Sequence, residues 1–298
     1  MRSADVVGAE AAAGAAPPLG DTAPRDRRRL GVAFWLSVGW IGVVVLAALL
    51  ADVLPLGSTS HTVGLRGAGP SAAHPFGLDS LGRDLLSRVV HGARVSLAVG
   101  FSSVAVSFLI GGVLGVLAGY YRGRVESLIM SGVDVLLAFP ALVLALAIVT
   151  FLGPGKLSNV ILAISILSIA PVARLLRATT LAYAQRDFVL AARTMGARDR
   201  EIIFREILPN LALPAAAYAL IGVALAILAE GGLAFLGLSV APPTPTWGGM
   251  INDGRTILDH SPQVTFIPAI VMFLTVLALN MAGDRLQSLL EFRESGLS

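Results

Sequence analysis

Six predominantly apolar stretches of this sequence, each of 17 residues or more and free of clustered proline, contain no Asp, Glu, Lys or Arg, and this feature constrains the fold most strongly. A helix that crosses a hydrocarbon core of roughly 30 Å needs about 20 apolar residues. The pattern therefore predicts an all-α integral membrane protein with six transmembrane helices. The uncharged runs are Leu30–Ala51, Val95–Tyr121, Val135–Leu152, Leu157–Ala173, Ile207–Ala229 and Ser261–Gly283. The spans drawn around them are 30–53, 95–121, 128–152, 157–175, 207–232 and 261–283.

The composition excludes a water-soluble globule. Hydrophobic residues make up 55% of the chain and charged residues only 14%, whereas soluble domains carry about 25% charged residues. The chain has no cysteine, so it can form neither a disulfide framework nor a thiolate metal site.

The distribution of basic residues predicts the orientation in the membrane. With both termini on one side, that side holds 16 of the 22 basic residues, and the other side holds six. The positive-inside rule then places both termini in the cytoplasm. Residues 1–29 and 286–298 are the expected cytoplasmic tails, and we expect the first to be disordered because it has little to pack. A cleaved secretory signal is the alternative for this end of the chain, but the first apolar run is longer than the apolar region of such a signal, which has about 7–15 residues.

A row of glycines in the second span indicates close helix packing. Gly111, Gly115 and Gly119 recur every four residues, and small residues at this spacing let another helix approach closely. The approaching helix belongs either to this chain or to a second subunit.

The stretch Arg174–Asn210 between the fourth and fifth spans is too long for a simple turn. Its pattern predicts a helix that presents the small residues Ala191 and Ala192 on one face with Met195. Gly196 then suits a helix stop. A second segment begins near Ile202, and Pro209 is a break signal within it. Such an elbow suits docking into a groove of a partner protein. The alternative is an amphipathic helix that rests on the membrane surface.

Three segments in this order resemble a known family. Ala191-Ala192 with Gly196 and Leu208-Pro209 resembles the EAA signature of ABC-importer permeases, which docks into the ATPase subunit. The segment from His74 to Leu97 resembles the one before the second helix of C-type dipeptide and oligopeptide permeases. The segment from Glu230 to Gly248 resembles the loop before the last helix of the same family. The resemblance covers residues 30–285.

The resemblance implies a type I ABC importer permease fold in a bacterial cell membrane. It implies a non-catalytic subunit that forms half of the translocation pathway for di- or oligopeptides. The implied partners are a second homologous permease, two ATPase subunits that hold ATP and Mg²⁺, and an extracytoplasmic solute-binding protein. Nickel chelates, glutathione and opines are the alternative solutes.

The resemblance also implies which residues dock into the ATPase, within a coupling loop at 176–206 and the start of the fifth span. Leu190 stands where the family motif has its acidic residue, and Asp187, three residues earlier on the same helix face, can substitute for it. The docking residues are Asp187, Ala191, Ala192, Arg193, Met195, Gly196, Ala197, Leu208 and Pro209.

The residues indicate no catalytic site, metal site or cofactor in this chain. The only lysine, Lys156, is followed by Leu157 rather than the Ser or Thr of a P-loop. The four histidines fall in segments expected outside, without a His-Glu-x-x-His helix. We therefore expect the bilayer and proteins, and no nucleic acid, as partners. An intramembrane hydrolase is the alternative from a different class.

Charged and aromatic residues near the spans are candidates for the solute pathway. Glu230 lies near the outer end of the fifth span, where it either lines the pathway or anchors a hydrogen bond between helices. Trp247 follows a Pro-rich loop and suits the membrane interface or a segment over the outer mouth. We expect a structural role for Asp134 and a helix kink at Pro140.

Overall fold

The computed structural model describes residues 31–295, with side chains as far as Ser288. The predicted tail at residues 1–29 lies outside the described residues. Within them the secondary structure is helical, and the β-pairing is limited to two isolated bridges. The long helices are α1 (Val32–Leu49), α2 (Leu85–Tyr121), α3 (Gly123–Ala138), α4 (Ala141–Leu152), α5 (Leu157–Tyr183), α8 (Leu208–Phe235) and α10 (Gln263–Ser295). The short elements are α6 (Asp187–Thr194), α7 (Asp199–Glu201), the π-helical η1 (Ile202–Ile207), α9 (Trp247–Gly254) and the 3₁₀ turn η2 (Arg255–Ile257).

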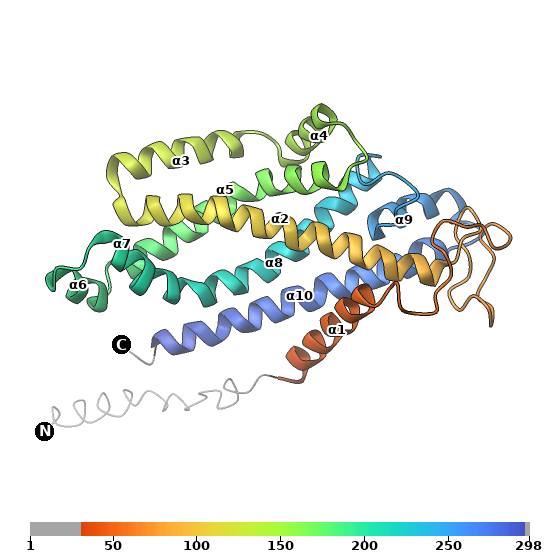
Figure 1. Ribbon diagram of the computed structural model, residues 1–298, viewed down its shortest axis with the longest axis horizontal. Helices are drawn as coiled ribbons and strands as arrows, with labels where there is room; N and C mark the ends of the chain where they lie inside the picture. The colour runs from red at the N-terminus through yellow and green to blue at the C-terminus, as the bar shows by residue number, and fades with distance from the viewer. Residues whose placement is uncertain (1–30, 296–298) are drawn as a thin grey trace, which may run out of the picture. The chain divides into compact units, whose positions relative to one another are not determined.

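Helices α2, α5, α8 and α10 run along one another and form the bundle, with α1 against α2 and α10 (Figure 1). Helices α6 and α7 project at one end of these helices, which we call the elbow end. Helix α9 and the long connection 50–84 lie at the opposite end, which we call the cap end. The candidate sites in these connections therefore lie at opposite ends of the bundle.

Among the described residues, five helices are long and apolar enough to cross a membrane. The predicted span 128–152 corresponds to α3 and α4, which meet at a bend of 88° and pass the same test only as a pair, so they give a sixth span if the two are counted as one. We expected a kink at Pro140, and the structure instead has a full break. Phe139 adopts an extended conformation (φ −88°, ψ 136°), as the residue before a proline prefers.

Large apolar side chains cover much of the outer surface. Trp35 and Leu36 on α1, Leu128 on α3 and Phe151 on α4 are all more than half exposed. Water would penalise such a surface, whereas a bilayer does not, so these helix faces fit contact with lipid or with other membrane chains.

The glycine row of α2 packs against α5. A Cβ atom added at Gly111, Gly115 or Gly119 would lie 2.5–2.6 Å from a backbone carbonyl oxygen of α5, at Ile169, Ala173 or Arg177 respectively. Only glycine permits this approach, since real Cβ contacts are longer than 3.0 Å. The glycine row was expected to face a helix of this chain or of a second subunit, and in the structure it faces α5 of the same chain.

Helix α8 continues directly from the elbow. The helical path from Asp199 to Phe235 is unbroken, although Pro209 suggested a stop. The π-helical turn η1 precedes it, and the amide of Leu208 donates to the carbonyl of Ile203 five residues back. Pro209 is the second residue of α8 and directly follows the π-helical turn, so the residue that has no N–H to donate lies where the hydrogen-bond pattern changes from π to α.

Candidate functional site

The elbow consists of α6, a left-handed turn at Gly196 and α7. Asp187 lies in the first turn of α6 and Arg193 in the last, and both charges complement the helix dipole. Gly196 has φ +84°, a conformation that favours glycine, and it reverses the chain toward α7.

The two faces of α6 have different environments. Val189 and Ala192 are buried against Ile202, Ile203 and Ile207 of the following turn. Ala192 was expected on the docking face with its neighbour Ala191. The structure corrects this, because Val189 and Ala192 are three residues apart and both lie on the inner face.

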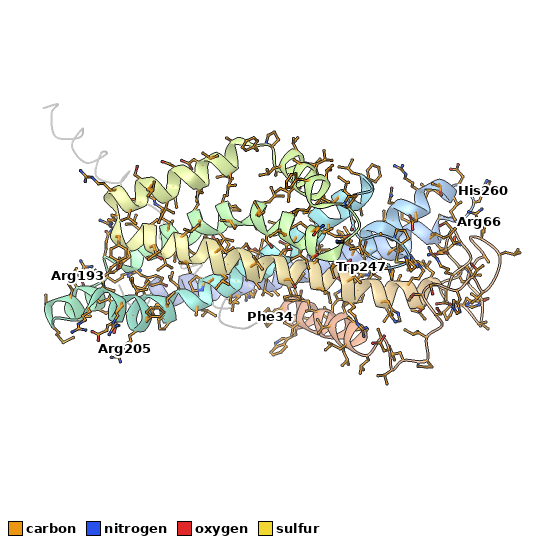
Figure 2. All side chains as sticks on the ribbon, turned by 45° about the horizontal axis from the view of Figure 1, so that its top comes forward. Phe34, Arg66, Arg193, Arg205, Trp247 and His260 are labelled. Atoms are coloured by element: carbon orange, nitrogen blue, oxygen red, sulfur yellow. The ribbon has the colours of Figure 1, made fainter. Side chains whose placement is uncertain are left out.

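The outer face of α6 is exposed and largely apolar. Ala191 is exposed, Met195 is 81% exposed and Leu190 is 46% exposed. Beside them a cleft of about 310 Å³ opens between Met195, Gly196 and Arg205. Figure 2 shows Arg193 and Arg205 at the elbow end of the bundle. The elbow thus offers an apolar helix face bordered by guanidinium groups.

A tyrosine of α2 fastens the elbow to the bundle. The Tyr120 hydroxyl donates to Asp199 Oδ1 of α7 at 2.8 Å. The Arg193 guanidinium lies 5.7 Å from the centre of the Tyr120 ring and donates to its hydroxyl at 3.4 Å. We call Tyr120, Arg193 and Asp199 the elbow latch. Sequence reasoning missed it, because Tyr120 lies 73 residues before Arg193.

At the opposite end, Asp79 organises the connection between α1 and α2. Its Oδ1 accepts from the amides of Leu81 at 2.8 Å and Arg83 at 2.9 Å. Its Oδ2 lies 2.7 Å from Arg83 Nε and 3.1 Å from Arg88 Nε. Both guanidinium groups are buried, and a buried charge requires such pairing. The segment from His74 to Leu97, which resembles a permease motif, therefore holds a buried ionic cluster at the cap end. We call this cluster of Asp79, Arg83 and Arg88 the knot.

Glu230 lies beside the start of α9, of which Trp247 is the first residue, and both side chains are fully buried. Glu230 Oε1 accepts from the Ser239 hydroxyl. Trp247 donates its Nε1–H to the Val89 carbonyl and its amide to Ser96 Oγ, both at 3.1 Å. Trp247 is therefore not at a membrane interface: it begins α9, its ring nitrogen donates to α2, and Figure 2 places it among the helices at the cap end. In this structure, neither side chain lines an open path.

A cavity of about 400 Å³ opens at the cap end between the 237–246 connection, α9 and the start of α2. We call it the cap cavity. Burial raises the pKa of the Asp253 carboxyl, and the nearby Arg88 and Arg83 guanidinium groups oppose this shift. Its polar lining side chains include Arg88, Ser239, Thr246, Asn252 and Asp253.

Asp134 pairs with Arg174 of α5 at 2.6 Å. A second pair, Glu126 with Arg177, joins the same two helices. These contacts tie α3 to α5. Within the described part of the chain, no group of three or more His, Asp or Glu side chains is arranged to hold a metal ion.

The helical bundle and its membrane-length helices define a class of protein, the multi-pass integral membrane protein. Comparison with known proteins gives the family. Residues 111–296 match the model of the binding-protein-dependent transport system inner membrane component. The chain therefore belongs to the ABC importer permease family, in its peptide, nickel and opine branch.

Curated relatives support this assignment. The chain is 45% identical over 223 residues to the glutathione transport system permease protein GsiD of Pectobacterium atrosepticum, covering 75% of this chain and 74% of the relative. It is 40% identical over 248 residues to the dipeptide transport system permease protein DppC of Alkalihalophilus pseudofirmus, covering 83% and 81%. Among solved structures, an inward-facing MetNI methionine ABC transporter shares the fold, with a TM-score of 0.57 and 18% identity over 69% of this chain and 97% of that one.

Proposed function

We propose that this permease forms half of the pathway through which a bacterial ABC importer carries di- or oligopeptides. Two relatives support a peptide solute, since one is named for dipeptide transport and the other for glutathione, itself a small peptide. In this proposal an extracytoplasmic binding protein delivers the solute to the cap end, and a second permease completes the pathway. Glutathione, nickel chelates and opines remain the alternative solutes, and glutathione is the one among them that is itself a peptide.

The exposed outer face of α6 carries the proposal for energy coupling. Ala191 on the eight-residue helix α6 and Met195 at its C-cap form a small, largely apolar surface. Such a surface suits insertion into a groove of an ATPase subunit. ATP and Mg²⁺ then bind in the two ATPase subunits, because the single lysine of this chain is not part of a P-loop.

The contacts of the elbow suggest how motion reaches the membrane helices. The elbow continues into α8 through η1, and the elbow latch joins it to the end of α2. An ATPase that moves α6 would therefore displace α2 and α8 together. Rigid-body rocking of this kind is a common route to alternating access.

The absence of cysteine from the sequence makes a direct test possible. In Met195→Cys, a thiol-specific cross-linker should join the elbow to an ATPase subunit in the assembled transporter, and a membrane-impermeant maleimide should not label it in intact cells. The matched control is Thr244→Cys, at an exposed position of the cap end, which should show the opposite pattern. Labelling of Met195→Cys from outside would overturn the orientation and the docking.

The solute is tested by uptake into proteoliposomes that contain the complete transporter and its binding protein. We expect ATP-dependent uptake of L-alanyl-L-alanine or glutathione. Uptake of a nickel chelate or an opine, with neither peptide transported, would refute the peptide assignment and leave the permease assignment intact.

A further inference from the structure

The cap cavity contains hydrogen-bond acceptors that lack donors. Within the part of the chain whose side chains are described, no hydrogen bond or ion pair engages the Asp253 carboxylate. The neighbouring Asn252 has its Oδ1 buried without a partner. Both residues line the cavity. A buried acceptor without a donor, such as the Asn252 oxygen, costs about 1–3 kcal/mol. The Asp253 carboxylate is only partly buried and lines the cavity, so a ligand that supplies donors can reach it there.

Arg88 contributes the opposite charge to the same cavity. Its Nη1 donates to the carbonyl oxygens of Thr59 at 2.8 Å and Pro243 at 3.3 Å, which fixes the guanidinium in place. Asp79 forms ion pairs with both Arg83 and Arg88, so the two buried guanidinium groups of the knot share a single carboxylate. Arg88 and Asp253 both line the cavity without forming an ion pair with each other. The cavity therefore has a fixed positive side and an acceptor-rich negative side.

We propose that the cap cavity binds the free ends of a small zwitterion, an amino acid or a dipeptide. The ammonium group binds to Asp253 and Asn252, and the carboxylate faces the Arg88 guanidinium. This inference rests on the proposed function, because it assigns to the cavity the first contact with a released solute. The ligand is defined by its two charged ends, and the side chains of the solute are not specified.

The chemistry of the two ends matches the cavity. An ammonium group presents three N–H donors and no acceptor, which suits a carboxylate and an amide oxygen that both lack donors. A zwitterion also keeps the local charge balanced, whereas a simple cation would add positive charge beside Arg83 and Arg88. The volume of about 400 Å³ lies within the usual range for small-molecule sites.

The proposal is tested by calorimetric titration of the complete transporter in lipid nanodiscs, without its binding protein. The probes are L-alanyl-L-alanine, its N-acetyl derivative, which lacks the ammonium, and its C-terminal amide, which lacks the carboxylate. We expect binding of the unmodified dipeptide and roughly tenfold or greater loss for each derivative, the scale of one charged hydrogen bond.

Variants assign the binding to this cavity. Asp253→Asn should weaken the dipeptide roughly ten- to hundredfold and should leave the N-acetyl derivative unchanged. Asn252→Leu, which removes the second acceptor, should act in the same direction. The matched control is Asp259→Asn, an exposed carboxylate beyond η2, which should bind the dipeptide as the unaltered protein does.

The outcomes separate this inference from the proposed function. Equal dipeptide affinity of Asp253→Asn and the unaltered transporter, or equal affinity for the dipeptide and its N-acetyl derivative, overturns the cavity assignment even if peptide uptake persists. Failure of every peptide in the uptake assay overturns the proposed function instead. In that case, Asp253-dependent binding of the dipeptide would still support a zwitterion site in the cavity.

Discussion

Replacement of Gly115 by alanine tests the packing of α2 against α5 at its tightest point. The added Cβ would lie 2.5 Å from the Ala173 carbonyl oxygen and 3.0 Å from the Arg177 amide nitrogen. Ordinary contact begins near 3.4 Å, so the two helix backbones must separate by roughly 1 Å, because neither obstacle is a flexible side chain. Overpacking of this kind costs about 1–3 kcal/mol.

The comparison with Gly39→Ala isolates that cost. Gly39 lies in α1 with nothing within 4 Å of an added Cβ, and both substitutions bring the same gain in helix propensity, about 1 kcal/mol. Gly115→Ala should therefore be less stable than Gly39→Ala by about 1–3 kcal/mol.

The free energy of unfolding is measured by titrating the purified protein in mixed micelles with a denaturing detergent. Gly112→Ala provides an internal check, because its added Cβ meets only the end of the Leu176 side chain, at 3.2 Å. That side chain can rotate away, so the effect should be small. Equal stability of Gly115→Ala and Gly39→Ala would refute the reasoning about backbone contact.

Three further predictions concern the two ends of the bundle. Tyr120→Phe removes the hydroxyl that binds Asp199; amide hydrogen exchange in 187–201 should accelerate by roughly fivefold, the scale of about 1 kcal/mol, while exchange in the bundle stays unchanged. Glu230→Gln should retain stability because it can still accept from Ser239, whereas Glu230→Ala should lower the free energy of unfolding by about 1–3 kcal/mol; equal unfolding midpoints would contradict this role. Burial raises the pKa of Asp253 above its unfolded value, so its carboxylate destabilises the fold at neutral pH. This penalty disappears as pH falls through the folded pKa toward the unfolded value of about 4. Asp253→Asn should therefore have the higher melting temperature near pH 7, and this advantage should vanish at low pH.

Much of the architecture follows from local patterns in the sequence. The uncharged runs locate the membrane-length helices, because apolar length alone decides whether a helix can span a bilayer. The glycine row of α2 indicates close packing because its spacing matches one helix face. The elbow is likewise predicted by Gly196, whose left-handed conformation is a property of the residue itself.

The remaining features depend on contacts between distant parts of the chain. Tryptophan is a residue type common at membrane interfaces, but Trp247 is buried because it binds Val89 and Ser96, about 150 positions earlier in the chain. The inward orientation of Ala192 depends on the isoleucines of the next turn, and the elbow latch depends on where α2 ends. Local pattern offers no signal for such pairings, because they arise only when α2, α8 and α9 pack together.

The π-helical turn η1 joins the elbow to the membrane helix α8. In an α-helix each residue advances the direction of a side chain by about 100°, and a π turn contains one more residue than an α turn of the same span. The π turn therefore holds one extra residue without changing the direction in which the elbow leaves α8. Deleting that residue from Ile202–Ile207 would restore a regular α-helix and leave the elbow in nearly the same direction, whereas deleting a residue from the α-helical part of α8 would turn the elbow by about 100° and carry Asp199 away from Tyr120. A chimaera that exchanges elbows between permeases can therefore lose the extra residue at η1 but must keep the number of residues in α8.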